Sequence, residues 1–337
     1  MLYTGMDVSA DKISVAVKNN SKLFKFKEFN NNASGHKQII KYISSKKCKT
    51  RVCLEATGVY HFDLAVAISN IQHFEIMVIN PRQAKHYATV INAKLKTDKA
   101  DAEILSDFAL RMKFVPWQRP SENRLRLRYY ARRIEALVHQ KAQSKNQLHA
   151  LEFSEYTPKE VIKSVQAMIA IYEQEIDRMQ KIALEQINQQ EDLREYFQLM
   201  ISISGVGERS AILLLGELLV LPDDLTNKQL VAFAGLNPKI VSSGKSVLKQ
   251  TKISKSGNKQ LRMALYMPAL TAVNCDPFMK AYYWHLIEDN GLKKLQALCA
   301  VMRKLLHAMN QMLKKKEIFC PARFYRLPVV ANQLIAS

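Results

Sequence analysis

Hydrophobic and polar positions alternate with a strand-like period over much of the first hundred residues. This pattern predicts strands over residues 2–8, 13–18 and 23–29, with a Ser-Ala-Asp turn between the first two. Helices are predicted over 35–45 and 60–69, and short buried strands over 51–55 and 75–79, the last ended by Asn80 and Pro81. Strands that alternate with helices indicate a mixed or parallel sheet covered by helices, which we assign to residues 1–118.

The strand-like pattern disappears beyond Thr97. Residues 99–113 are helical in period, and Pro116 and Pro120 then interrupt the chain. From 121 to about 190 glycine is nearly absent and Pro158 is the one interruption, which predicts two long helices joined near 155–158 as an antiparallel coiled coil. Residues 119–191 would form this region and 192–337 a second helical domain, so the predicted fold class is α/β plus all-α.

Charge narrows the choice of partners. The 337 residues include 50 Lys and Arg against 30 Asp and Glu, a net charge of +20. Such a charge attracts polyanions, of which nucleic acid is the commonest, although it does not distinguish DNA from RNA or from an acidic membrane surface. No segment approaches the roughly 18–20 apolar residues of a membrane span. The N-terminus lacks the pattern of a secretory signal.

The five cysteines are odd in number and show no paired metal-ligand spacing. They are typical of reduced thiols in a cytoplasmic protein and argue against both a disulfide framework and a zinc site.

The first long helix carries a nearly one-signed run of positive side chains. A solvated helix face is the ordinary interpretation of such a run, but an intrahelical network of salt bridges would mix both signs. We therefore favour a helix that faces nucleic acid, with Arg124, Arg128 and Arg132 as its contacts. The complete run is Arg119, Arg124, Arg126, Arg128, Arg132, Arg133, Lys141 and Lys145.

Four carboxylates have the spacing of a metal site. Asp7 lies at the end of the first predicted strand and Glu55 closes a later one, and ligands gather at strand ends in open α/β sheets. Asp98 and Asp101 are three residues apart at the start of a helix and share a face. Such a set could bind two Mg²⁺ ions about 3.5–4 Å apart and support phosphoryl transfer. Alternatively, Asp98 is an acid favoured by the helix dipole.

A glycine turn follows within residues 203–211. Gly205 and Gly207 between two apolar segments resemble a helix-hairpin-helix element, in which backbone N–H groups bind phosphate without reading sequence. The alternative is a helix-to-helix turn that needs glycine for a positive φ.

A serine loop lies in a stretch that has several cations and no acid between Asp224 and Asp276. A serine on a glycine-flanked loop among cations could attack a phosphodiester, whose developing charge the cations would stabilise. Ser243 precedes Gly244, although Ser242 offers another register and a turn residue is the commoner role. Gly244 to Ser246 resembles the end of a P-loop, but the glycine spacing and the missing strand exclude ATP binding. The cations proposed to bind nucleic acid here are Lys245, Lys252, Lys255, Lys259 and Arg262.

Together, these pieces resemble the DEDD-type insertion-sequence transposases of the IS110/IS1111 family, whose relatives include the Piv-type DNA invertases. The matching motifs occur in the family order and span most of the chain. They are Met6-Asp7-Val8-Ser9, Leu54-Glu55-Ala56-Thr57-Gly58, Asn80-Pro81, Lys96-Thr97-Asp98-Lys99-Ala100-Asp101-Ala102, Gly205-Val206-Gly207, Gly235-Leu236-Asn237-Pro238, Ser242-Ser243-Gly244 and Ile253-Ser254-Lys255-Ser256-Gly257-Asn258.

The resemblance implies a RuvC-like (RNase H-like) domain in which Asp7, Glu55, Asp98 and Asp101 hold Mg²⁺. It also implies a serine, read here as Ser243, that forms a transient phosphoserine linkage with DNA. A structured non-coding guide RNA and assembly into dimers or tetramers are implied in the same way. The sequence departs from the family where Ala10 and Asp11 precede Lys12, and where Ser204 replaces a common proline. Neither departure removes a catalytic group.

Three other functions stay open on the sequence. A RuvC-like structure-selective nuclease would use the same carboxylates to activate water and would need no serine. A site-specific invertase would share the chemistry and differ in its DNA substrates. A non-catalytic nucleic-acid scaffold would need only the basic helices and the glycine turn.

Overall fold

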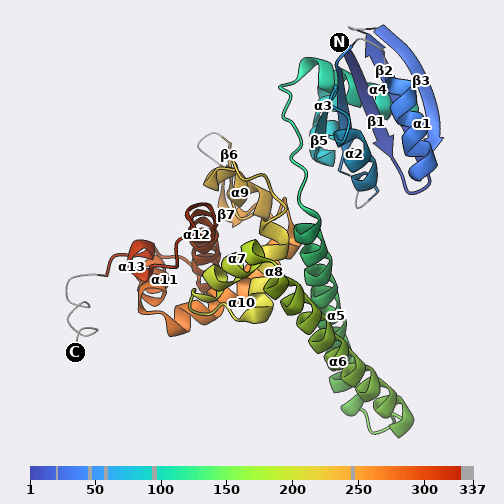
Figure 1. The fold of residues 1–337 in the computed structure, drawn as a ribbon. Coiled ribbons are helices and arrows are strands. Elements are labelled where there is room, and N and C mark those ends of the chain that lie inside the picture. The colour runs from blue at the N-terminus through green and yellow to red at the C-terminus, as the bar shows by residue number, and fades with distance from the viewer. Residues whose placement is uncertain (20–21, 45–47, 57–59, 93–96, 244–246, 328–337) are drawn as a thin grey trace. The chain divides into compact units, whose positions relative to one another are not determined.

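The chain divides into two compact units, Met1–Arg119 and Pro120–Ser337. The computed structural model describes residues 1–19, 22–44, 48–56, 60–92, 97–243 and 247–327, with the backbone alone for residues 24, 240–243 and 247–251. Figure 1 shows the elements of each unit.

The first unit is built on a five-stranded mixed sheet in the order β3-β2-β1-β4-β5. Strand β2 runs antiparallel to β1 and β3, whereas β1, β4 and β5 are parallel. The predicted α/β character of this region is confirmed. Its strands are Leu2–Val8 (β1), Lys12–Asn19 (β2), Lys22–Asn30 (β3), Thr50–Glu55 (β4) and Phe74–Ile79 (β5), and its helices are Ala33–Ile43 (α1), Phe62–Ser69 (α2), Pro81–Val90 (α3) and Asp98–Arg111 (α4).

Helix α3 was not predicted, because Asn80 and Pro81 were read only as the end of a strand. Both residues also begin a helix. The Asn80 side chain accepts a hydrogen bond from a backbone N–H of the first turn, and the Asn80 N–H donates one to the side-chain oxygen of Gln83. Pro81 occupies the first helical position, where its fixed φ suits the helix and its missing N–H costs nothing.

Two separate cores cover the two faces of this sheet. On one face, Met6 and Leu54 pack with residues of α1 and α2, such as Ile39 and Leu64. On the other face, Cys53 and Met77 of the sheet pack with residues of α3 and α4. Because side chains alternate along a strand, Asp7 and Glu55 lie on the α3–α4 face.

The second unit is mostly helical, as predicted. Its elements are Glu122–Glu152 (α5), Lys159–Gln189 (α6), Glu191–Ile201 (α7), Glu208–Leu218 (α8), Asn227–Ala234 (α9), Pro238–Ser243 (β6), Val247–Ile253 (β7), Lys259–Cys275 (α10), Pro277–Glu288 (α11), Lys294–Lys315 (α12) and Pro321–Phe324 (α13). The antiparallel hairpin of β6 and β7 corrects the expectation of an all-helical domain. None of the helices in the described ranges is long and apolar enough to cross a membrane.

Helices α5 and α6 are 31 residues each and lie side by side (Figure 1). On α6 the buried residues Ile169, Ile176 and Ala183 are seven apart, the spacing of a coiled-coil seam. Leu127 of α5 and Ile187 of α6 join the same hydrophobic core as α7, α8, α10 and α12. The base of the helix pair is therefore part of this core. All of residues 138–168 are described, and none of their side chains is buried.

Candidate functional site

Two carboxylates sit together at one edge of the mixed sheet. Strands β1 and β4 are parallel, and Met6 pairs with Leu54. Asp7 and Glu55 are the next residues on their strands and project to the same face. The sheet register therefore brings together two residues that are 48 positions apart in the sequence, as the strand-end pattern predicts.

Gly5 allows helix α4 to approach these strand ends. A Cβ at Gly5 would lie 2.1 Å from the backbone oxygen of Ala102 and 2.2 Å from the backbone nitrogen of Ser106. Only glycine permits this contact between helix and strand, and α4 therefore crosses directly over β1. Asp98 and Asp101, in the first turn of α4, precede this crossing point by about one turn.

The start of α4 is defined by Thr97, whose side chain accepts a hydrogen bond from the N–H of Ala100 at 3.1 Å. Asp98 is exposed, whereas Asp101 is partly buried. An acid in a first helical turn also has a favourable interaction with the helix dipole, so the local role suggested for Asp98 is compatible with this position.

The four carboxylates influence one another electrostatically. Burial, followed by the charges of Asp101 and Asp98, raises the pKa of Asp7 to about 6. Burial, followed by the charges of Asp7 and Asp101, also raises the pKa of Glu55. Among the described residues, every charge that shifts these two groups is another carboxylate. The site therefore concentrates negative charge that a bound cation would neutralise.

The four carboxylate side chains do not converge on one point in this structure. Within the described ranges, no three His, Cys, Asp or Glu side chains converge closely enough to hold a metal ion. The donor chemistry nevertheless fits a hard divalent cation, because all four groups supply oxygen and repel one another. Cys53, on the same face of the sheet, is no competing ligand, since burial raises the pKa of its thiol to about 12.

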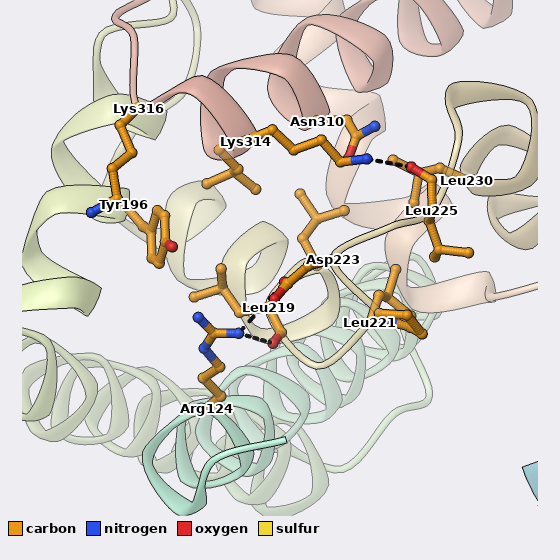
Figure 2. A pocket seen from close by; sticks show the side chains of 13 residues that line it. Arg124, Tyr196, Leu219, Leu221, Asp223, Leu225, Leu230, Asn310, Lys314 and Lys316 are labelled. Atoms are coloured by element: carbon orange, nitrogen blue, oxygen red, sulfur yellow. Dashed lines mark hydrogen bonds and ion pairs between the residues drawn. The ribbon is translucent and has the colours of Figure 1, made fainter. Parts of the chain in front are cut away.

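The basic residues of α5 have partners that the sequence did not reveal. Arg124 donates to the backbone oxygen of Leu219 at 3.4 Å and pairs with Asp223 at 3.8 Å. Figure 2 shows this guanidinium directed into a cavity of about 340 Å³ that Tyr196 also lines. Arg124 is thus part of the internal structure of the second unit.

Arg128 and Arg132 share a buried carboxylate. Glu217 of α8 is 2% exposed and accepts hydrogen bonds from Arg132 at 2.7 and 3.3 Å. Arg128 lies 3.5 Å from the same group, and the Asn258 side chain donates to it at 2.6 Å. Arg126 pairs with Glu122 within α5, whereas the acids that pair with Arg124, Arg128 and Arg132 lie outside this helix. The sequence argument considered only salt bridges within the helix and not acids elsewhere in the chain, and nucleic-acid binding by these arginines stays a prediction.

The two glycines of the 203–211 turn differ in their surroundings. Gly205 has φ +90°, and a Cβ there would lie 2.7 Å from the Ala272 nitrogen and 2.8 Å from the Pro268 oxygen. It therefore satisfies the turn interpretation and packs on α10. Gly207 caps the start of α8, and a Cβ there would meet nothing within 4 Å. Of the two positions, Gly207 has the room for a phosphate.

Ser243 is the last residue of β6, and its backbone pairs with Val247 of β7. The connecting residues, including the predicted contact Lys245, lie outside the described residues. The base of the hairpin is held where the Ser254 hydroxyl donates to the Asn237 side chain at 2.6 Å and the Ser254 N–H donates to the Asn237 carbonyl at 2.8 Å.

The remaining cations around the hairpin fall into two groups. Lys252, Lys255 and Lys259 are exposed and available to a polyanion. Arg262 instead donates to the backbone oxygens of Ala234 at 2.8 Å and Asn258 at 3.2 Å, and burial lowers the pKa of its guanidinium. Arg262 therefore fixes the chain around the hairpin.

Sequence reasoning missed one basic surface in the first unit. Arg82, Lys85 and His86 are exposed on one face of α3 and line a shallow hollow with Thr89 and Val90. The sequence contains these basic residues three and four positions apart. That spacing places them on one face only if the segment is a helix, and this helix was not predicted.

Comparisons with known proteins cover both units. A DEDD-type IS110 transposase model matches residues 4–153, and the model described as transposase IS116/IS110/IS902 family matches residues 197–284. The pilin gene-inverting proteins of Moraxella bovis and Moraxella lacunata are each 30% identical over 301 residues, 86% of this chain and 89% of theirs. An uncharacterized 43.6 kDa protein of insertion element IS110 from Streptomyces coelicolor is 32% identical over 139 residues, 40% of this chain and 33% of its own length.

Proposed function

Since the chain belongs to the IS116/IS110/IS902 family of transposases and is a DNA recombinase, we propose that it cleaves and rejoins DNA with a metal-bound carboxylate site and a serine nucleophile. The observation that carries the proposal is the group of acids at the strand ends, where burial, followed by the charges of neighbouring carboxylates, raises the pKa of Asp7 to about 6 and also raises the pKa of Glu55. A group of acids that destabilise one another in the metal-free protein is typical of a cation-binding catalytic site.

We propose that the first unit is RuvC-like and that Asp7, Glu55, Asp98 and Asp101 hold Mg²⁺. Four carboxylates supply enough oxygen ligands for two ions. The mixed sheet supports this assignment, because Asp7 and Glu55 directly follow the paired residues Met6 and Leu54, and Gly5 lets the helix that carries the other two acids come close. When bound, Mg²⁺ would neutralise the carboxylates and stabilise charge on a phosphodiester.

The serine step assigned to Ser243 is a transesterification. The Ser243 oxygen forms a bond to phosphorus and gives up its proton, while the bond from phosphorus to one bridging oxygen of the DNA breaks. That oxygen leaves as a hydroxyl after taking up a proton. Attack by a DNA hydroxyl on the phosphoserine reverses these changes and rejoins a strand, so no cofactor is consumed. Exposed Lys252 and Lys255, near the base of the hairpin, support this proposal by adding positive charge there.

The proposed partners are DNA, a structured guide RNA and further copies of this chain, as dimers or tetramers. The net charge of +20 supports the nucleic acids. Phe153 and Tyr156, which are 88% and 95% exposed between α5 and α6, support a protein contact at the tip of the helix pair. Light scattering of the wild type and of Phe153→Ser/Tyr156→Ser tests the assembly, which we expect the double variant to weaken.

The function is tested by trapping the covalent intermediate. Full-length protein, Mg²⁺, end-labelled DNA spanning an element end and RNA transcribed from the flanking sequence are incubated and run on a denaturing gel. We expect a labelled protein–DNA adduct with the wild type and with Ser242→Ala. The adduct should disappear with Ser243→Ala and with Asp98→Ala, and addition of EDTA before the DNA should have the same effect.

Each alternative gives another pattern on this gel. Metal-dependent cutting that persists in Ser243→Ala without an adduct would identify a RuvC-like nuclease that uses water. Loss of the adduct in Ser242→Ala but not in Ser243→Ala would move the nucleophile by one position. Nucleic-acid binding with no strand breakage, unchanged in Asp98→Ala, would indicate a scaffold and refute the proposal.

Site-specific inversion is a second candidate function. The gene-inverting proteins of Moraxella align with most of this chain and with most of their own length, which favours it. Inversion and transposition would share the chemistry above. A plasmid carrying one DNA segment between inverted copies of the element junction distinguishes them, since an invertase reverses the segment whereas a transposase excises or inserts it.

A further inference from the structure

We propose that the exposed face of helix α3 binds the phosphate backbone of the DNA strand that enters the carboxylate site. Arg82 and Lys85 would supply the charges, with His86 beside them. This inference rests on the proposed function and identifies the surface in the first unit on which the substrate strand lies.

The position of α3 follows from the sheet register. Glu55, the last residue of β4, pairs with Ile79, the last residue of β5, and the Ala56 N–H donates to the Ile79 carbonyl at 2.9 Å. Helix α3 begins two residues after Ile79, and Arg82 lies in its first turn. The basic face therefore starts at the edge of the sheet that carries Asp7 and Glu55.

The two faces of α3 differ in chemistry. Ala84 and Tyr87 are buried in the core that α3 shares with α4, and the Tyr87 hydroxyl donates to Asp107 of α4. The opposite face is exposed, and the whole helix contains no acid. Because Tyr87 anchors α3 to the helix that carries Asp98 and Asp101, the basic face has a fixed position relative to the carboxylates.

Among the described residues, the α3 cations have no protein partner, whereas several other cations of the first unit do. Lys18 and Arg111 pair with Asp107, and Arg51 pairs with Glu75. The side chains of Arg82, Lys85 and His86 make no ion pair or hydrogen bond within the part of the chain that the structure describes. Three exposed basic groups without an intramolecular partner are available to an external anion.

A DNA strand fits this surface better than an isolated anion. Residues 82 to 86 span about 6 Å along the helix axis at about 1.5 Å per residue. One strand of duplex DNA carries a phosphate about every 3.4 Å of axis, so the face matches about two successive phosphates. We choose DNA rather than the guide RNA because the surface adjoins the carboxylates, which would act on the strand being cut.

The test measures how DNA affinity depends on salt. Full-length wild type is compared with Arg82→Gln/Lys85→Gln and with a charge-matched control, Lys37→Gln/Lys41→Gln, whose residues are exposed on α1. Fluorescence anisotropy with labelled element-end duplex, in EDTA without RNA, gives Kd from 50 to 200 mM KCl. Thermal denaturation confirms that each variant is folded.

Counterion release predicts a slope of about −0.9 per phosphate contact in a plot of log K against log salt. The α3 variant should therefore lose about 1.8 from the magnitude of the slope, and its Kd at 0.1 M salt should rise about 60-fold. We expect the α1 control to keep the wild-type slope.

An unchanged slope in the α3 variant, or equal losses in both variants, would overturn the inference. If the α3 variant bound RNA more weakly than wild type but bound DNA equally well, the inference would also be overturned, because the surface would then bind RNA. Failure of the proposed function is recognised separately. In that case wild type would form no adduct and cut no DNA, while the slope would still decide whether α3 binds a DNA backbone.

Discussion

Replacing Asp7 with asparagine should make the metal-free protein more stable and at the same time inactive. The carboxylate of Asp7 is partly buried and lies in the field of Asp101 and Asp98, which together raise its pKa from 3.8 to about 6. Asparagine has nearly the same shape, carries no charge, and keeps an oxygen that can accept the hydrogen bond from the Val8 N–H.

The size of the effect follows from the pKa shift. About two pKa units at 1.36 kcal/mol each correspond to roughly 3 kcal/mol by which the ionised carboxylate disfavours folding. Some solvent reaches this side chain, so we expect a gain of about 1–3 kcal/mol at pH 7.5.

The gain has a definite pH dependence. The folded protein holds the Asp7 proton below pH 6, whereas the unfolded chain releases it above pH 3.8. Wild-type stability from this group therefore rises as the pH falls from about 6 to about 4. Below that range both states are protonated at this site, and Asn should have no advantage from charge.

The assay uses the two tryptophans of the chain, which fall in different units. Trp117 packs edge-on against Phe62 at 5.8 Å and reports on the first unit, whereas Trp284 belongs to the second and is 40% exposed. In a Trp284→Phe background, Trp117 fluorescence during urea unfolding in EDTA gives the free energy of unfolding of the first unit. Added Mg²⁺ should then stabilise the wild type and not Asp7→Asn.

Two results would refute the reasoning. Equal or lower stability of Asp7→Asn at pH 7.5 in EDTA would mean that burial and the neighbouring carboxylates do not disfavour the ionised form of Asp7 in the folded protein. A gain of the same size at pH 4 would mean that asparagine acts through packing or hydrogen bonding rather than through removal of charge.

Two further substitutions test the packing of the two units. Gly5→Ala would place a methyl group 2.1 Å from the Ala102 oxygen, so α4 must move, and we expect a loss of about 1–3 kcal/mol in urea unfolding together with loss of DNA cleavage. Wild-type cleavage by this variant would contradict the role of the close contact. Glu217→Ala leaves three donors without their carboxylate, so we expect the free energy of unfolding to fall by about 2–4 kcal/mol. The loss is limited to this size because the paired arginines are partly hydrated. Urea unfolding followed by Trp284 fluorescence in a Trp117→Phe background measures it, and an unchanged midpoint would show that water replaces the carboxylate.

The α/β architecture and the predicted position of the acids were accessible because both depend on local periodicity. Strands β1 and β4 each end near a carboxylate, and parallel strands align their ends, so Asp7 and Glu55 could be placed together from the sequence. The contact at Gly5 could not, because it depends on where α4 crosses the sheet. The metal, the serine chemistry and the guide RNA stay predictions that came from the family resemblance.

Partners that are distant in the sequence explain why the α5 arginines were misread. Glu217 is 85 residues from Arg132, and no local pattern relates an acid on α8 to a helix in another part of the chain. The hairpin was missed for another reason. Its strands are short and rich in lysine and serine, so they lack the alternating apolar residues by which a half-buried strand is recognised.

The pair of long helices also has the mechanical properties of a lever. Each helix of 31 residues is about 46 Å long at 1.5 Å per residue. The base of the pair joins the core of the second unit, and there Arg128 and Arg132 of α5 bind Glu217 of α8. Between this contact and the end of α5 lie about 30–36 Å of helix, so a tilt of about ten degrees at the contact would move that end by about 6 Å. A small change of angle around one buried carboxylate would thus become a displacement of several ångströms near Phe153 and Tyr156.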